Sequence, residues 1–294
     1  MPEAAPATTV RIRALLPSLA PAERRVAECV LTDPAAVAAS TIGLLARQCA
    51  TSETTVIRFC RAVGFTGYPA LRLSLAAEAG RHQAGNGHDA TGDIAADDDL
   101  DKVVATIAFA DARAVEDTAD QLDLGTLHAV VDAIVEARRV DVYGVGASGF
   151  VALDFQQKLH RIGRVAFAWN DTHVALTSAA LLTGSDVAVA ISHSGATADT
   201  LDALALARRR GAVTVAVTNF PRSPLARLAD HLLTTAARET TFRSGATASR
   251  LAQLTVVDCV FVGVAQRTYE TSQRALDLTH EAVRDRRVGH KTAR

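Results

Sequence analysis

The chain has 294 residues, of which 49% are apolar and 21% charged, and its formal net charge is −1 at pH 7. This length is enough for two ordinary domains with separate cores, and the near-zero charge excludes a chain that is basic throughout. Any nucleic-acid-binding face therefore has to be local. The sequence has no apolar run of about 18 residues and no signal peptide, which predicts a cytoplasmic protein with no membrane partner.

The cysteines form no C-x-x-C pair and fall within apolar helical patterns. We therefore expect buried thiols, with neither disulfides nor a zinc site, and we expect no metal and no resident cofactor. The cysteines are Cys29, Cys49, Cys60 and Cys259.

Residues 1–79 show helical patterning from the start and predict an all-α domain. An amphipathic segment (Val10–Leu19) precedes a helix that begins at Pro21 and is stopped by Asp33-Pro34. Two more helices follow, joined by a tight connection at residues 50–52. The first has the capping pair Ser40-Thr41 and the apolar positions Ile42, Leu45, Ala46 and Cys49; the second has the apolar positions Val56, Phe59, Cys60 and Val63 and ends at Gly64.

The outer face of the second helix of this pair carries Thr54, Arg58 and Arg61 at i, i+4 and i+7. Two helices joined by a short turn are typical of the helix-turn-helix, whose second helix enters the major groove of DNA. Arginine can bind guanine or a phosphate there, and hydroxyls near the helix start suit backbone oxygens. The alternative is an ordinary helical hairpin with a solvated outer face. The predicted DNA-binding residues are Thr51, Ser52, Thr54, Thr55, Arg58 and Arg61.

Residues 1–80 contain eight arginines against six acidic residues, a surplus of two. Because phosphate neutralisation supplies most non-specific affinity for DNA, one such domain would hold DNA weakly. We therefore expect a homodimer or homotetramer, formed through the C-terminal domain, that presents these helices to adjacent half-sites of an operator.

Residues 80–99 are polar and rich in Gly and Asp, so we expect a flexible linker, although its acidic end is alternatively the cap of the next helix. The second domain (100–294) opens with two helical patterns. From Arg139 strands alternate with helices, which predicts an α/β three-layer sandwich around a five-stranded parallel sheet. The predicted strands are 140–143, 165–169, 187–191, 212–217 and 231–235; the predicted helices are 100–122, 124–137, 147–162, 173–182, 199–210, one that begins at Pro224 behind the capping residue Ser223, and 247–266.

Two loops follow strands at the edge of the sheet where ligands of such folds sit. They are Gly144-Val-Gly-Ala-Ser-Gly149 and Ser192-His-Ser-Gly-Ala-Thr197, and a helix follows each. This arrangement directs backbone N–H groups and the positive end of a helix at an anion. Ser192, Ser194 and Thr197 add uncharged donors, and Gly195 lets the backbone come close, which predicts a phosphate site. An ordinary Ser/Thr-capped turn is the alternative.

Gly144, Gly146 and Gly149 also match the dinucleotide fingerprint G-x-G-x-x-G, and Asp171 stands where a ribose-binding acid would. The hydroxyl of Ser148 and the second hydroxyl-rich loop favour one compact phosphorylated molecule over an extended dinucleotide. A dinucleotide site stays open as the less favoured alternative.

The sequence resembles the RpiR/MurR-type bacterial transcription regulators, which join an N-terminal helix-turn-helix to a C-terminal SIS (sugar isomerase) domain. The resemblance covers nearly the whole chain. The motifs that carry it are Pro21-Ala-Glu-Arg-Arg-Val-Ala27, residues 52–68, Gly144-Val-Gly-Ala-Ser148, Asp171-Thr-His173, residues 192–197, Thr218, Ser223-Pro-Leu-Ala226 and Ala229-Asp230.

This resemblance implies a SIS fold and a transcription regulator whose SIS domain senses a phosphorylated sugar and alters operator binding. His193 and Ala196 fill positions that vary in the family, which leaves the sugar open. The implied ligand-binding residues are Gly144, Gly146, Ser148, Ser192, Ser194, Gly195 and Thr197, with the four hydroxyls on the phosphate.

SIS domains also serve as isomerases and as a lyase, so catalysis is the alternative function. Moving a proton along a sugar requires Glu or His as general base, and the chain offers His160, His173, His193 and Glu239. The attached helix-turn-helix favours a regulator that is not an enzyme. We expect the basic tail (Arg284, Arg286, Arg287, Lys291 and Arg294) to be a frayed, solvated end or to contact DNA phosphates.

Overall fold

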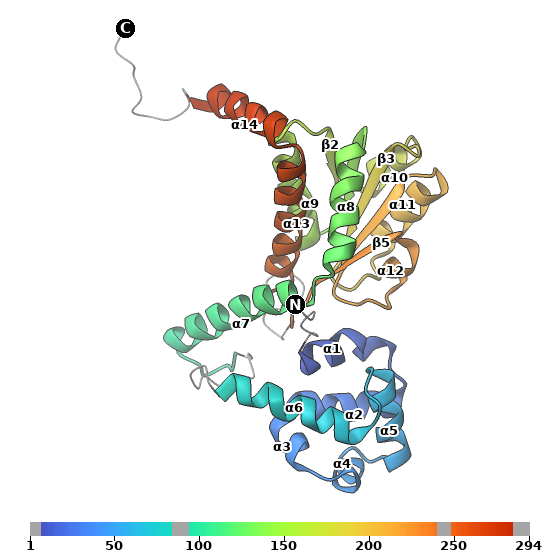
Figure 1. Cartoon of the computed structure of the whole chain (residues 1–294), viewed down its shortest axis with the longest axis vertical. Coiled ribbons are helices and arrows are strands. Elements are labelled where there is room, and N and C mark those ends of the chain that lie inside the picture. The colour runs from blue at the N-terminus through green and yellow to red at the C-terminus, as the bar shows by residue number, and fades with distance from the viewer. Residues whose placement is uncertain (1–6, 84–93, 240–247, 285–294) are drawn as a thin grey trace.

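The computed structural model describes residues 7–83, 94–239 and 248–284, as a helical head and an α/β domain (Figure 1). The head forms because its helices each bury one apolar stripe against the others. Its core includes the inner positions predicted for the helix pair. The head consists of α1 (Thr8–Leu15), the 3-10 turn η1 (Leu16–Ser18), α2 (Pro21–Thr32), α3 (Pro34–Ala39), α4 (Ile42–Gln48), α5 (Glu53–Ala62) and α6 (Tyr68–Gln83).

Side-chain caps set the boundaries of the helix pair as the sequence predicts. Thr41 caps α4, and the Ser52 hydroxyl accepts from the backbone N–H of Thr55 to cap α5. Ser40 does not share in the capping; it is buried, with its hydroxyl 3.0 Å from that of Tyr68. The helix pair therefore rests on α6 through this buried hydroxyl contact.

The boundary predicted at residue 80 falls inside a helix, because α6 continues to Gln83. Residues 84–93 of the predicted linker lie outside the described residues. At the other end, the Asp99 carboxylate accepts from the backbone N–H of Lys102 at 2.8 Å and caps α7. The acidic end of this segment is therefore a helix cap, which was the alternative that the sequence left open.

The α/β domain is the predicted three-layer sandwich. Its five strands are all parallel, in the order β2-β1-β3-β4-β5. Helices α8, α9 and α13 cover one face and α10, α11 and α12 the other (Figure 1). The strands are β1 (Arg139–Tyr143), β2 (Ala166–Trp169), β3 (Asp186–Ile191), β4 (Val213–Thr218) and β5 (His231–Thr234); the helices are α7 (Leu100–Gln121), α8 (Leu124–Glu136), α9 (Ala147–Arg161), α10 (Thr172–Ala179), α11 (Ala198–Arg209), α12 (Pro224–Leu228), α13 (Ala248–Arg267) and α14 (Tyr269–Arg284).

Among the described residues, one helix, α13, is long and apolar enough to cross a membrane. Its residues Val256, Val257, Val260 and Val264 are buried in the core that it shares with α8 and α9. An apolar helix that packs in this way is typical of a protein core. We therefore assign α13 as a core helix of the α/β domain.

The last helix, α14, was missed, and the prediction of a frayed tail from Arg284 onward is wrong at that residue because Arg284 ends this helix. Its sequence is amphipathic, so the pattern was available, and Ser272 is the one buried residue that α14 contributes. The remaining tail residues (286, 287, 291 and 294) lie outside the described residues.

Two of the predicted buried thiols, Cys29 and Cys259, are only half-buried, whereas Cys49 and Cys60 are buried.

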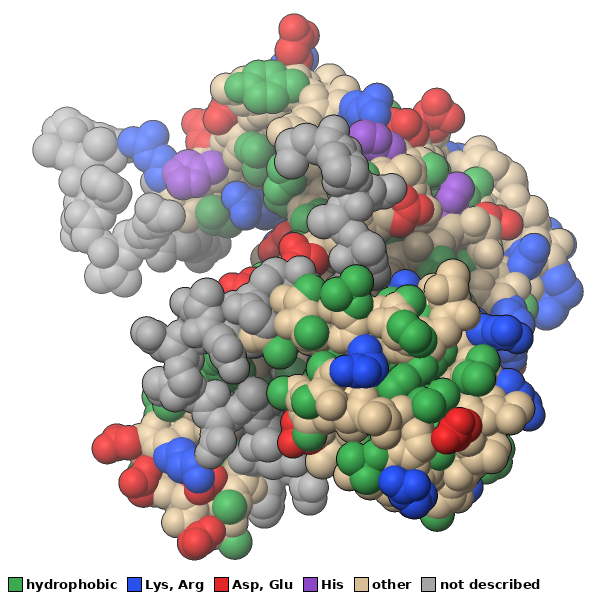
Figure 2. Space-filling model, turned by 60° about the horizontal axis from the view of Figure 1, so that its bottom comes forward, with side chains coloured by type: hydrophobic (Ala, Val, Ile, Leu, Met, Phe, Trp, Pro, Cys, Tyr) green, Lys and Arg blue, Asp and Glu red, His purple; other side chains and the backbone are tan. Residues whose placement is uncertain are grey.

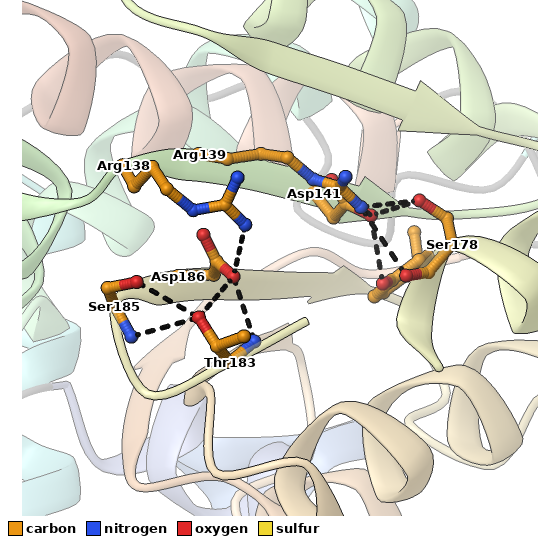
Figure 3. A network of polar contacts seen from close by, with 8 residues as sticks. Arg138, Arg139, Asp141, Ser178, Thr183, Ser185 and Asp186 are labelled. Carbon is orange, nitrogen blue, oxygen red and sulfur yellow. Dashed lines mark hydrogen bonds and ion pairs between the residues drawn. The ribbon is translucent and has the colours of Figure 1, made fainter. Parts of the chain in front are cut away.

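Two buried carboxylates anchor polar networks on the sheet, Asp186 at the start of β3 and Asp141 in the middle of β1 (Figure 3). Asp186 on β3 binds Arg138 at 2.8 Å. Burial raises the pKa of Asp186, but hydrogen bonds from Arg138 and Thr183 outweigh it, and the net shift is downward. Asp141 on β1 is fully buried and binds Arg139 at 2.7 Å. These acids hold the sheet together and lie away from its carboxyl edge.

Replacing Asp141 with asparagine is expected to lower the free energy of unfolding by about 3 to 5 kcal/mol, because Arg139 would lose its buried anion. The amide would also turn a donor toward the Trp169 indole N–H (2.9 Å) and the Ser178 hydroxyl (2.7 Å). Urea denaturation measures the loss. The control is Asp132→Asn, whose half-exposed pair with Arg267 at 3.3 Å is expected to contribute less than about 1 kcal/mol. Equal losses of unfolding free energy in both variants would contradict a stabilising role for the buried Asp141.

Candidate functional site

The two predicted anion-binding loops begin at neighbouring strands. β1 and β3 pair in parallel, with Tyr143 opposite Ala190. Because both strands run in the same direction, their carboxyl ends lie at one edge, and the loops 144–149 and 192–197 emerge there side by side. The fold therefore brings the predicted site residues of the α/β domain to a single place.

The first loop is a close approach between backbone segments. A Cβ at Gly144 would lie 2.7 Å from the carbonyl oxygen of Ser148, and Gly146 has a φ of +58°. α9 begins directly after Gly146, and within the described chain no side chain caps this helix. The buried Ser148 hydroxyl lies 3.1 Å from the side-chain nitrogen of Gln253 on α13. The Ser148 side chain is therefore held in place by a helix that is distant in sequence and adjacent in the fold.

The second loop presents hydroxyls around the start of α11. The Ser192 hydroxyl is 3.0 Å from that of Thr197 and accepts from the Gly195 N–H at 3.1 Å. The Ser194 hydroxyl accepts from the Ala196 N–H at 3.2 Å. Thr197 occupies the N-cap position, yet its hydroxyl caps no N–H of the described helix. The first turn of α11 thus keeps backbone donors that an anion can accept from.

Gly195 fixes the second loop against the segment that follows β4. Its φ is +60°, and a Cβ there would lie 2.2 Å from the Ser223 hydroxyl oxygen and 2.8 Å from that of Thr218. Its carbonyl oxygen accepts from the Leu225 N–H at 2.9 Å. Only glycine allows this approach, so the loop and the start of α12 are packed as one unit.

His193 and Glu239 lie beside this loop. Their closest nitrogen and oxygen are 3.9 Å apart, and the Glu239 carboxylate accepts from the Ser249 hydroxyl at 2.7 Å. Burial lowers the pKa of His193, while Glu239 opposes that shift. The ring also stands edge-on to Phe220, with centroids 5.5 Å apart. At neutral pH His193 is therefore an uncharged side chain wedged between the two segments that follow β4 and β5.

The predicted DNA-binding side chains lie on the solvent side of the helix pair. Ser52, Thr54, Arg58 and Arg61 are exposed, and Thr51 and Thr55 are half-buried. Arg58 forms an ion pair with Glu23 at 3.3 Å, but 65% of its side chain stays exposed. Figure 2 shows the head with its basic side chains scattered singly among apolar and polar ones. The face is accessible to a duplex without being strongly basic.

Comparison with known proteins decides the family. A helix-turn-helix domain model of the rpiR family matches residues 8–81, and a SIS domain model matches residues 133–263. An uncharacterized HTH-type transcriptional regulator of Caldanaerobacter subterraneus subsp. tengcongensis is 38% identical over 95% of this chain and 98% of that protein. The chain belongs to the rpiR family of HTH-type transcriptional regulators. YbbH of Bacillus subtilis, another uncharacterized HTH-type regulator, is 33% identical over 94% of this chain and 97% of its own.

Solved structures agree with this rpiR-family assignment. The Vibrio vulnificus NanR protein complexed with ManNAc-6P is 30% identical, with a TM-score of 0.61 over 96% of this chain and 100% of that one. The sugar isomerase domain of an RpiR transcription factor from Sphaerobacter thermophilus is 28% identical, with a TM-score of 0.57 over 61% of this chain and 99% of that domain. The chain is therefore a helix-turn-helix regulator with a SIS domain, as the sequence predicts.

The structure gives Asp171 a role that needs no dinucleotide. Its carboxylate accepts from the Val174 N–H at 3.0 Å and caps α10. A small hollow lies between the ends of β1 and β2 and the start of α11. There, Asp199 accepts from the Thr172 hydroxyl at 2.6 Å, which joins α10 to α11. Each of the two carboxylates therefore has a structural role at a helix start.

Sequence reasoning missed two residues that contact the site. Gln253 holds Ser148 although 105 positions separate them. A buried glutamine in an otherwise apolar helical stretch was the available signal, because such a side chain needs a partner. Phe220, which packs on His193, follows β4 and carried no signal of its own. Among the residues that the structure describes, no group of three His, Cys, Asp or Glu side chains is placed to hold a metal ion.

Proposed function

We propose that this rpiR-family regulator binds a phosphorylated sugar at the loops 144–149 and 192–197, and that the bound sugar changes its affinity for an operator. The observation that carries the proposal is the pair of neighbouring helices, α9 and α11, that start at adjacent strand ends without a side-chain cap in the described chain. Elsewhere caps are common, since side chains cap α3, α4, α5, α7, α8, α10 and α12.

The chemistry of the two loops suits a phosphate. Each helix start carries about half a positive charge and unused N–H donors. The hydroxyls of Ser148, Ser192, Ser194 and Thr197 add donors that can rotate toward the oxygens of a phosphoryl group. Gly144, Gly146 and Gly195 let the backbone approach the ligand. The likeness to NanR complexed with ManNAc-6P supports a phosphosugar as the class of ligand.

The head supports binding to a duplex operator. Arg58 and Arg61 point outward from α5, and the hydroxyls of Thr51, Ser52, Thr54 and Thr55 lie around its start. Because one head has a small positive surplus, we propose that two or four copies, joined through their SIS domains, grip the two half-sites together. Such a complex would work in the cytoplasm, where the DNA is, and would need no membrane partner.

We propose that the SIS domain of this chain senses its sugar without converting it. The candidate bases His193 and Glu239 face each other, and Glu239 also accepts from Ser249. The named relatives are transcriptional regulators rather than isomerases. Incubation with each sugar phosphate and separation of the products tests this point, and catalytic turnover of any of them would favour the enzyme alternative.

A thermal-shift screen against a panel of sugar phosphates tests the ligand. A phosphosugar that binds only the folded state raises the melting temperature; at 100 times its Kd it adds about 2.7 kcal/mol of stability. The double variant Ser192→Ala with Ser194→Ala is expected to lose this shift and to keep its affinity for the operator. Loss of two charge-assisted hydrogen bonds predicts a Kd at least about 100-fold weaker.

Ser185→Ala is the control, because Ser185 is exposed at the opposite, amino end of β3. It is expected to retain the full thermal shift. If no sugar phosphate stabilises the wild-type protein and NADH does, the dinucleotide alternative holds. If the double variant keeps the full shift, the ligand lies elsewhere in the SIS domain.

A further inference from the structure

The DNA-binding head rests on the loops that follow β4 and β5. α1 is the helix of the head nearest the α/β domain (Figure 1). It faces these loops across a small cavity. Val10, one of the lining residues of α1, is 4% exposed. The cavity is lined by Val10, Arg13 and Ala14 from the head and by Asn219, Thr235, Ala236 and Ala237 from the α/β domain.

The loop after β4 is hydrogen-bonded both to the proposed phosphate loop and to the loop after β5. The carbonyl oxygen of His193 accepts from the Asn219 N–H at 3.1 Å and from the Thr218 hydroxyl at 3.0 Å. The side-chain oxygen of Asn219, which is 3% exposed, accepts from the Ala237 N–H at 2.7 Å and from the Thr235 hydroxyl at 3.2 Å. Asn219 therefore spans from the ligand side of the sheet edge to the cavity beside α1.

A charged cluster lies at the same junction. Arg13 of α1 is half-buried, and its pKa is lowered by burial and by Arg238, which follows β5. Asp117 of α7 and Glu78 of α6 act on Arg13 in the opposite direction. Glu239, the neighbour of Arg238, is the residue that faces His193. Charged side chains of α1, α6, α7 and the segment after β5 therefore lie near one another at this junction.

A second contact joins the head to the loop after β4. Arg222 donates to the carbonyl oxygen of Ala62 at 3.4 Å and approaches the Ser18 hydroxyl at 3.5 Å. Ala62 is the last residue of α5, so a cation here also faces the negative end of the predicted recognition helix. The next residue, Ser223, is the one that packs on Gly195.

From these contacts we propose that the loops 219–223 and 235–239 form a docking surface for the DNA-binding head, and that this surface transmits the state of the phosphate loop to α1 and α5. The proposal rests on the proposed phosphosugar site. A ligand that moves the backbone at His193 would shift Asn219, which lines the cavity together with Arg13. It would also shift the loop after β4, from which Arg222 contacts the end of α5. Arg13 is a positioning residue here, since it touches neither the ligand loops nor the outer face of α5.

Arg13→Ala is the test, with the full-length protein and a stabilising sugar phosphate from the thermal-shift panel. Ligand Kd is expected to stay within about two-fold of wild type, and operator affinity without ligand within a few-fold. The ligand-induced change in operator affinity, expected at about 5- to 150-fold in the wild type, is expected to fall below two-fold. Arg209→Ala, at the exposed end of α11, removes the same charge and is expected to keep the full change.

Arg222→Ala gives an independent reading if Arg13→Ala folds poorly, because Arg222 lies in an exposed loop segment. It is expected to reduce the ligand-induced change while ligand binding persists. If both variants bind ligand and DNA and keep the full change, the docking surface does not transmit the signal. If the wild type binds no sugar phosphate, the proposed site itself has failed.

Discussion

Replacing Arg58 and Arg61 together with alanine is expected to abolish operator binding. Both side chains lie on the exposed face of α5, whereas Val56, Phe59 and Cys60 anchor the helix in the core of the head. A well-placed arginine contact to a base contributes about 1 to 3 kcal/mol of discrimination. Two such losses amount to about 2 to 6 kcal/mol, or roughly 30-fold to more than 10,000-fold in Kd. Arg58 also pairs with the buried Glu23, but 65% of its side chain stays exposed and accessible to DNA.

A gel shift measures the effect, with an operator fragment that the wild-type protein selects from randomised duplex DNA. Arg209→Ala with Arg210→Ala is the matched control, because it removes two exposed arginines from the far end of α11. Light scattering and circular dichroism show whether the oligomer and the fold persist. If both double variants bind within about three-fold of wild type, α5 is not the recognition helix.

The slope of log Kd against log salt separates two roles for these arginines. Loss of one phosphate contact lowers the slope by about one, whereas loss of a base contact leaves it nearly unchanged and relaxes sequence preference. The slope is measured on the single variants Arg58→Ala and Arg61→Ala. It shows whether each side chain contacts the DNA phosphate backbone or a base. The structure places Arg58 in the middle of α5 and Arg61 in its last turn.

The layered fold could be predicted because each element has its own local pattern. β3 is buried along its whole length, and the matching unbroken apolar run predicts a strand covered on both faces. The start of α12 could be predicted from two residues, because Ser223 caps the helix and Pro224 is its first residue. Such elements need no knowledge of distant residues.

Elements whose burial depends on distant partners could not be predicted in this way. α6 extends past Gly80 to Gln83, although glycine and polar residues read locally as linker. There, contacts made elsewhere along the helix decide its length, and the local sequence does not contain them. α14 is a different case: its sequence is amphipathic, and the sequence analysis overlooked that pattern.

The candidate site likewise has a part that local sequence predicts and a part that depends on distant residues. The loops after β1 and β3 could be predicted because parallel strands bring their carboxyl ends to one edge. The surroundings could not, since Gln253 on α13 and Asn219 after β4 reach the loops from remote parts of the chain. Their placement depends on strand order and helix packing, which no local motif encodes.

Gly195→Ala is expected to eliminate the response to sugar phosphate and to lower the free energy of unfolding by about 2 to 5 kcal/mol. The positive φ alone costs an alanine about 1 to 2 kcal/mol, and the Cβ would also overlap the Ser223 hydroxyl at 2.2 Å. The loop 192–197 would have to leave the start of α12, which would separate the hydroxyls that we propose hold the phosphate. Thermal shift with and without the ligand, together with urea denaturation, measures both effects.

Alanine variants at two other glycines distinguish the cost of the positive φ from the cost of the steric overlap with Ser223. Gly146 also has a positive φ, but a Cβ there meets no described atom within 4 Å, so the unfolding free energy of Gly146→Ala reports the conformational cost alone. Gly184 has ordinary space, with its nearest atom at 3.6 Å, and Gly184→Ala is expected to keep both stability and ligand response. If Gly195→Ala matches Gly184→Ala in both measurements, the loop does not depend on its contact with Ser223, and the phosphate geometry argued from that contact is wrong.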